Sequence, residues 1–148
     1  MSTNLNILYI GNLKNYFNLD DHKNCSIVTL ENSIKATKYL QSDEKIDAII
    51  CDYNLPGNTG VFLYDWIRAQ TDFDNIPFIL VSKEFSADIY KTAFIKKIDD
   101  FYVSSVTNPN DILNRVEFLC VHRKPISKKV ATKVSAKVKE EGYKMPIS

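Results

Sequence analysis

An acidic side chain follows a short apolar stretch, at the kind of position where chemistry is found in α/β proteins. Asp52 comes directly after Ala48–Cys51, and a Pro-Gly turn and a second apolar stretch follow it. Ser82 ends the next apolar stretch along the chain. Ligands collect beyond the carboxyl ends of parallel strands, so a carboxylate and a hydroxyl at two neighbouring ends form a candidate site. Taken alone, Asp52 would be interpreted as a loop cap, and Ser82 as a hydroxyl bonded to nearby backbone.

The other reactive side chains form no recognisable catalytic or metal-binding pattern in the sequence. Cys25, Cys51 and Cys120 are odd in number and widely separated, which predicts neither a disulfide framework nor a zinc site. His22 and His122 are isolated, without the neighbours that a catalytic or metal-ligating histidine needs. The chain has only 4 glycines, and they form no phosphate-binding loop. We therefore expect no catalytic residue, no metal site, no cofactor and no independent enzyme activity.

The elements that must position Asp52 and Ser82 alternate between strand and helix. Short apolar stretches rich in β-forming residues predict five strands, over Leu5–Ile10, Ser26–Leu30, Ala48–Cys51, Phe78–Val81 and Phe101–Val103. Apolar residues at helical spacing predict four helices, over Ser33–Leu40, Val61–Ile67, Ile89–Ile95 and Ile112–Leu119. Apolar strands joined by helices indicate a doubly wound, five-stranded parallel sheet in a three-layer α/β/α sandwich. The first crossover, Gly11–Asn24, is rich in Asn and Asp, so we expect a short or irregular helix there.

At these positions the sequence resembles the receiver domains of two-component response regulators, over about residues 6 to 120. Four features carry the resemblance: Asp52 as phosphoacceptor, Leu55-Pro56-Gly57 with Gly60 after it, Ser82 as switch hydroxyl, and Phe101 after Asp99-Asp100 as switch aromatic. The resemblance implies a flavodoxin-like fold. It also implies a regulatory role in two-component signalling, exerted through contacts with other proteins.

The same resemblance reveals two departures. Where the family has an acidic pair that binds a divalent cation, this chain has Gly11-Asn12, and Ser104-Ser105 stands where the family has a lysine and a proline. Phosphoryl transfer to a carboxylate relies on Mg²⁺ and on a cation that offsets the charge of the phosphoryl oxygens. Asp52 with the backbone carbonyl of Asn54 is a poor Mg²⁺ site, because a hard cation prefers several oxygen ligands.

Two interpretations of Asp52 therefore stay open. In the first, Asp52 is phosphorylated in an unusual geometry, Ser82 donates to a phosphoryl oxygen and Phe101 follows it inward, and Mg²⁺ is bound for that reaction. Other acids, Asp20, Asp21 or Asp99, could replace the missing pair only if loops bring them in. In the second, Asp52 is a vestigial acid in an interaction module that works without phosphorylation. We favour the second, because two separate contributions to the same mechanism are missing.

Receivers commonly meet partners or dimerise through the surface of the fourth helix, fifth strand and fifth helix. In this chain that surface is rich in apolar and aromatic residues: Ile89, Tyr90, Phe94, Tyr102, Val106 and Ile112. If these side chains are exposed, they favour a protein partner or a homodimer. The alternative is that about half of them belong to the core.

The net charge of +1 sums two unlike parts of the 148-residue chain. Residues 121–148 carry eight basic and two acidic residues, a net charge of +6, which leaves −5 for residues 1–120. This change beside Pro125 predicts a receiver-like domain over 1–122 and a basic tail over 123–148. The tail is either a linker or a weak amphipathic helix with Val130, Val134 and Val138 on one face, leading to an output module beyond it.

The last seven residues, Gly142–Ser148, are similar to the stretch that leads into the membrane module of bacterial polyprenyl-phosphate sugar-phosphate transferases. That resemblance implies a regulatory domain of a glycosyltransferase of polysaccharide synthesis, with the basic tail at an anionic membrane surface. The chain has no apolar run of the roughly 20 residues that span a bilayer and no signal peptide. We therefore expect a cytoplasmic domain, at the inner face of the membrane in a full-length protein. A DNA-associated regulator is disfavoured, because 28 residues leave no room for a DNA-binding output domain.

Overall fold

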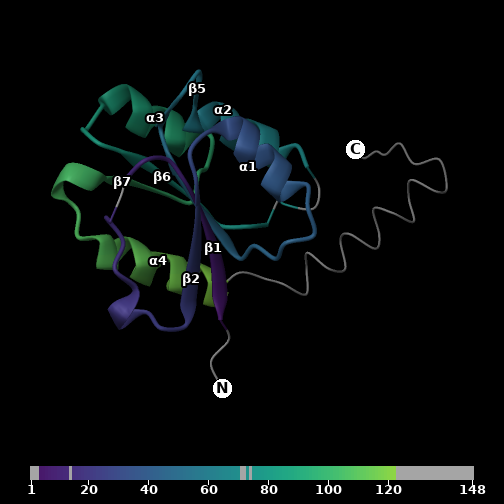
Figure 1. Ribbon diagram of the computed structural model, residues 1–148. Helices are drawn as coiled ribbons and strands as arrows, with labels where there is room; N and C mark the ends of the chain where they lie inside the picture. Colours follow the sequence, from purple (N-terminus) through teal and green to yellow (C-terminus); the bar gives the residue numbers. More distant parts are fainter. Residues whose placement is uncertain (1–3, 14, 71–72, 74, 123–148) are drawn as a thin grey trace.

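The computed structural model describes residues 4–13, 15–70, 73 and 75–122, so the predicted basic tail lies outside the described residues. Five parallel strands form one sheet in the order β2-β1-β3-β6-β7 (Figure 1). The strands are β1 (Leu5–Ile10), β2 (Cys25–Leu30), β3 (Ala48–Asp52), β6 (Phe78–Ser82) and β7 (Asp100–Val103). Every residue of β3 and β6 is buried, as a sheet covered on both faces requires. The predicted five-stranded, doubly wound sheet is confirmed.

Among the described residues, four helices complete the three layers: α1 (Ser33–Leu40), α2 (Gly60–Arg68), α3 (Ala87–Ile95) and α4 (Pro109–His122). α1, α2 and α3 cover one face of the sheet and α4 covers the other (Figure 1). The first three begin at side-chain caps, because Asn32, Thr59 and Ser86 each accept a hydrogen bond from a backbone N–H in the first turn. The caps set where each helix begins and therefore where the loops above the sheet lie.

The first crossover contains no α-helix among its described residues. A single 3-10 turn, η1 (Leu19–Asp21), interrupts an otherwise irregular path from β1 to β2. Apolar side chains of this path take the place of a helix and pack on the same sheet face as α4: Leu13, Tyr16, Phe17 and Leu19. The prediction of a short or irregular first crossover is confirmed. These side chains, and not a regular helix, cover this part of the sheet face.

A short hairpin that the sequence did not predict leads from the acid to α2. Its strands, β4 (Asn54–Leu55) and β5 (Asn58–Thr59), are antiparallel, and Pro56-Gly57 forms the turn between them. Gly57 has φ 73°, a conformation that favours glycine. A Cβ on Gly60 would overlap the backbone carbonyl of Asp52, so a glycine there lets α2 begin directly against the end of β3.

The described part of the chain includes no helix that is both long enough and apolar enough to cross a membrane.

Candidate functional site

The carboxyl edge of the sheet brings the two predicted polar residues to neighbouring strand ends. Asp52 is the last residue of β3 and Ser82 the last of β6, and the register pairs Asp52 with Val81. Asp52 is buried, with 9% of its surface exposed, and Ser82 is 5% exposed. The expectation that an acid and a hydroxyl meet at this edge agrees with the placement of both residues.

Both oxygens of the Asp52 carboxylate are engaged by hydrogen bonds from the chain itself. The Tyr9 hydroxyl donates to Oδ1 at 2.7 Å, and the backbone N–H of Asn12 donates to Oδ2 at 3.2 Å. The same hydroxyl accepts from the backbone N–H of Leu13 at 2.9 Å, so Tyr9 joins the acid to the loop after β1. Burial raises the pKa of Asp52 above its ordinary value, and the two bonds to the carboxylate act against that shift. Burial, with Asp52 beside it, also raises the pKa of Tyr9, so the phenol remains a donor.

The first predicted departure has a structural reason at Gly11. A Cβ built on this residue would overlap Cγ and Oδ2 of Asp52 and would lie 2.5 Å from the Tyr9 hydroxyl. A side chain at position 11, and above all a carboxylate, therefore does not fit beside the Asp52–Tyr9 pair. The hydrogen bond between Tyr9 and Asp52 therefore occupies the space that a side chain at position 11 would need, and only glycine fits there.

The residues present around Asp52 do not fit a Mg²⁺ ion. Asp52 is the carboxylate to which Tyr9 and the Asn12 amide donate, and the side chain of Asn54 is exposed on the hairpin. Glu31 lines the hollow beside Asn12 and Asn54, and it forms no ion pair or hydrogen bond with Asp52 among the described residues. Asp99 lies at the opposite edge of the sheet, where it accepts from the backbone N–H of Phe78, the first residue of β6. A hard cation that needs six oxygens finds too few of them here.

The second departure leaves Asp52 without an ion-pair partner among the described residues. Ser104 is buried and Ser105 is exposed, and both lie in the 3-10 turn η3 (Ser104–Val106) that follows β7. None of the ion pairs formed by described residues includes Asp52. Within the described residues, the negative charge of Asp52 is therefore stabilised only by hydrogen bonds from the Tyr9 phenol and the Asn12 backbone amide.

The two predicted switch residues have partners other than Asp52. The Ser82 hydroxyl donates to the backbone carbonyl of Glu84 at 2.6 Å, inside the loop that follows β6. Phe101 on β7 is half-buried, and its ring centroid lies 6.1 Å from that of Tyr90 on α3. Ser82 therefore bonds to its own loop, and Phe101 packs beneath the outer face of α3.

The predicted interface divides into exposed and buried members. Tyr90 is 53% exposed and Phe94 is 75% exposed, whereas Tyr102 is half-buried. Ile112 is completely buried in the core beneath α4, so its assignment to the interface is wrong. Residue 112 sits on the inner face of α4, and helical spacing alone did not distinguish that face from the outer one.

Sequence reasoning missed two groups of residues that the fold brings together. Tyr9 was assigned to an apolar strand, although a phenol inside an otherwise aliphatic stretch is a signal that a buried partner is needed. His22 was described as isolated, which is wrong, because its ring lies against Glu117 and close to Cys25. More than ninety residues separate Glu117 from the other two, so no local spacing could have shown that group.

A buried acid at the carboxyl edge of a doubly wound sheet, with a hydroxyl on the next strand and an aromatic on the last, defines a receiver-type signalling domain. The model of the response regulator receiver domain family matches residues 7–117, and the chain belongs to this family.

Curated relatives include two-component response regulators of plants. ORR3 of Oryza sativa subsp. indica is 27% identical over 86 residues, which cover 58% of this chain and 65% of that protein. ARR17 of Arabidopsis thaliana is 31% identical over 71 residues, or 40% of this chain and 46% of that protein. The matches thus span about half to two thirds of the relatives' own length.

Solved structures with the same fold include bacterial receiver domains. The receiver domain of HemR from Leptospira biflexa has a TM-score of 0.67 and 17% identity, and the match covers 82% of this chain and 98% of that one. The receiver domain of RstA from Klebsiella pneumoniae has a TM-score of 0.65 and 20% identity, covering 78% and 97%. At these identities the likeness shows the fold alone.

Proposed function

We propose that this domain is an atypical receiver, which regulates a larger protein through protein contacts without phosphorylation of Asp52. The observation that carries the proposal is the closed hydrogen-bond arrangement in which Tyr9 and the Asn12 amide engage both carboxylate oxygens. A phosphoacceptor needs a free carboxylate oxygen to attack phosphorus, together with cations that neutralise the equatorial oxygens. Here the Tyr9 hydroxyl holds one oxygen, and Gly11 leaves no room for the cation-binding carboxylate.

The mass of the intact protein tests this proposal. The full chain is incubated with Mg²⁺ and acetyl phosphate or a phosphoramidate, with Asp52→Asn as the matched control. We expect no labile addition of about 80 Da, the mass of one phosphoryl group, in either protein. An addition that appears in the native chain and is absent from Asp52→Asn would instead establish Asp52 as a phosphoacceptor.

Phosphorylation of Asp52 remains the second candidate function, and one observation favours it. Asp52 and Ser82 end neighbouring strands, as a phosphoacceptor and its switch hydroxyl would. For that function the Ser82 hydroxyl would have to leave the Glu84 carbonyl, and Tyr9 would have to release Oδ1. The mass measurement distinguishes the two functions directly.

An apolar surface on and around α3 is the proposed contact region for a protein partner or a second copy of the domain. Its members are widely exposed: Phe85 at 64%, Tyr90 at 53%, Phe94 at 75%, Ile95 at 70% and Val106 at 82%. Phe85, Tyr90 and Phe101 also form a row of neighbouring rings from the loop after β6 to β7. Large apolar side chains gathered in this way mark interaction sites more often than solitary ones do.

Sedimentation velocity of the full chain tests whether this surface joins two copies. We expect a concentration-dependent dimer that Phe94→Ser weakens at least tenfold, while Ile34→Ser, on α1 and 67% exposed, leaves it unchanged. A monomer at every concentration would contradict the homodimer and leave a different protein as the candidate partner. An equal effect of both substitutions would contradict a specific interface.

We further propose that residues 123–148 connect this domain to an output module, with a membrane-bound sugar-phosphate transferase as the module implied by resemblance. The support is the charge of the segment, since Lys and Arg next to a membrane are attracted to anionic lipid by about 1 kcal/mol each. Flotation with vesicles tests it: the full chain should bind vesicles that contain anionic lipid and not neutral ones. Binding that is equal for a chain ending at residue 122 would contradict a role of the segment. Salt-dependent binding to duplex DNA would favour the DNA-associated alternative.

A further inference from the structure

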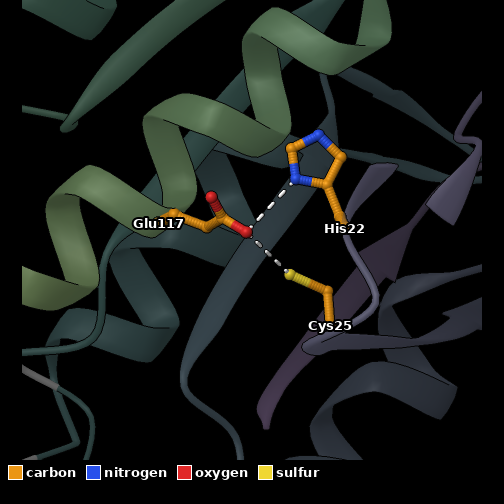
Figure 2. Close-up of side chains that lie close together, drawn as sticks. All are labelled: His22, Cys25 and Glu117. Carbon is orange, nitrogen blue, oxygen red and sulfur yellow. Dashed lines mark hydrogen bonds and ion pairs between the residues drawn. The ribbon is translucent and has the colours of Figure 1, made fainter. Parts of the chain in front are cut away.

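Three potential metal ligands meet at the edge of the sheet opposite Asp52 (Figure 2). His22 follows η1, Cys25 is the first residue of β2, and Glu117 lies on α4. His22 is 4% exposed and Cys25 is 6% exposed, while the Glu117 side chain retains 30% exposure. Their ligand atoms all lie within 4.8 Å of one another. The imidazole and the thiol both point to one carboxylate oxygen, so the three groups share a centre.

The distances between these atoms match those around a tetrahedral zinc ion. Nδ1 of His22 lies 3.2 Å from Oε2 of Glu117, and Sγ of Cys25 lies 3.6 Å from the same oxygen. Zinc bonds of about 2.1 Å to nitrogen and oxygen and about 2.3 Å to sulfur give ligand separations of about 3.4 Å and about 3.6 Å at tetrahedral angles. Two of the three ligand separations therefore agree with a zinc ion, and the third, between the His22 ring nitrogen and Cys25 Sγ, is within 4.8 Å.

The backbone holds the ligands in place before any ion binds. The N–H of Cys25 donates to the carbonyl of His22 at 3.0 Å, which fixes the turn between them. Cys25 is also paired with Leu5 of β1. Glu117 follows Val116, which is fully buried and anchors this part of α4 on the sheet. Two of the ligands thus come from a strand and a helix of the sandwich, and the third comes from the short turn between η1 and β2.

We propose that His22, Cys25 and Glu117 form a binding site for a zinc ion that links the start of β2 to α4. A thiolate, an imidazole and one carboxylate suit zinc, whereas Mg²⁺ and Ca²⁺ require mostly oxygen ligands. The two negative ligands balance the charge of the ion, and a water molecule would complete its tetrahedral coordination. Burial and the neighbouring Glu117 raise the pKa of the Cys25 thiol to about 12, so binding breaks the S–H bond and releases one proton to solvent.

Zinc and cobalt titrations of the full chain, produced without a histidine tag and freed of metal, test the proposal. We expect one zinc per chain, a rise in the unfolding temperature with zinc and none with Mg²⁺, and a thiolate-to-cobalt charge-transfer absorption. Cys25→Ser should abolish that absorption and Glu117→Gln should weaken zinc binding by more than about 100-fold, beyond the effect of an outer-shell residue. His122→Gln is the matched control, because His122 is exposed on the same helix and should leave binding unchanged.

Three results would overturn the proposal. The first is a native chain that shows no cobalt–thiolate absorption, a result that does not depend on whether any variant folds. The second is zinc binding that persists undiminished in both Cys25→Ser and Glu117→Gln. The third is absorption that vanishes in Cys120→Ser and persists in Cys25→Ser, which would move the site to another thiol. In each case the three side chains are a hydrogen-bonded group without a metal.

Discussion

Replacing Tyr9 with phenylalanine removes one oxygen atom and two hydrogen bonds from a buried site. The hydroxyl donates to ionised Asp52 at 2.7 Å and accepts from the Leu13 N–H at 2.9 Å, and Tyr9 is only 1% exposed. A hydrogen bond to a charged group contributes about 1.5–3 kcal/mol and a neutral one about 0.5–1.5 kcal/mol. We expect Tyr9→Phe to lower the free energy of unfolding by about 2–4 kcal/mol, because both partners lose their bond without gaining full access to water.

Urea unfolding of four variants, one of them the double variant of Tyr9→Phe and Asp52→Asn, measures this effect and its origin. Tyr39→Phe is the matched control, since Tyr39 is half-buried on α1 and forms no hydrogen bond through its hydroxyl in the described structure, and its loss should stay within about 0.5 kcal/mol. A double-mutant cycle with Asp52→Asn should show a coupling of about 0.5–3 kcal/mol, as expected for residues in contact. The reasoning is refuted if Tyr9→Phe is no more destabilising than Tyr39→Phe, or if the coupling is zero.

The same variant has a defined dependence on pH. Burial holds the pKa of Asp52 above its ordinary value of 3.8, and the Tyr9 bond opposes that shift by favouring the ionised form. The bond therefore contributes fully above the pKa of Asp52 and is lost as the pH falls through it. The stability gap between the native chain and Tyr9→Phe should be widest near neutral pH and narrow in acid. A gap that widens in acid would mean that Tyr9 stabilises a protonated Asp52.

Further substitutions probe the rest of this edge of the sheet. Gly11→Ala should destabilise the fold by about 1–3 kcal/mol in urea unfolding, because its Cβ would overlap the Asp52 carboxyl group; an unchanged midpoint would contradict the crowded geometry. Ser82→Ala should cost about 0.5–1.5 kcal/mol through loss of the bond to the Glu84 carbonyl, and a loss above about 3 kcal/mol would indicate a further partner. Phe94→Ser should leave the free energy of unfolding within about 0.5 kcal/mol while weakening self-association, because its side chain is 75% exposed.

Much of the fold could be predicted because its signals are local. β3 and β6 are continuous apolar runs that end in a polar residue, and Asp47 precedes β3 while Pro77 precedes β6. Their type and limits are therefore visible without any knowledge of the neighbouring strands. The shortage of helix formers after β1 likewise indicated an irregular crossover. The β4–β5 hairpin was missed because two-residue strands carry no periodicity, although Pro56-Gly57 marked the turn.

The candidate site could be predicted only in part, because its contacts are distant in sequence. Asp52 and Ser82 follow from strand ends, whereas the bond between Tyr9 and Asp52 joins residues 43 positions apart. The sequence shows only that position 11 has glycine where the family has an acid. That the position requires a small residue follows from the Tyr9–Asp52 bond, which the sequence alone does not reveal. Ile112 was misplaced for a related reason, since the apolar stripe of α4 gives the buried face only once the path of the helix is known.

The described residues of the irregular segment between β1 and β2 form few backbone hydrogen bonds within that segment. Its described part includes a 3.4 Å bond from the N–H of Tyr16 to the carbonyl of Leu13 and a 2.9 Å bond from His22 to Leu19. A cover held by side chains and not by a helical ladder can detach while the sheet stays folded, so its amides should exchange with deuterium sooner than those of α4. Because this segment closes over Asp52 at one end and carries His22 at the other, a single opening event would uncover the acid and release Glu117 together. Asp52 and the group of His22, Cys25 and Glu117 lie at opposite edges of the sheet, and the same segment contacts both. The free energy of opening this segment therefore sets how often solvent reaches either site.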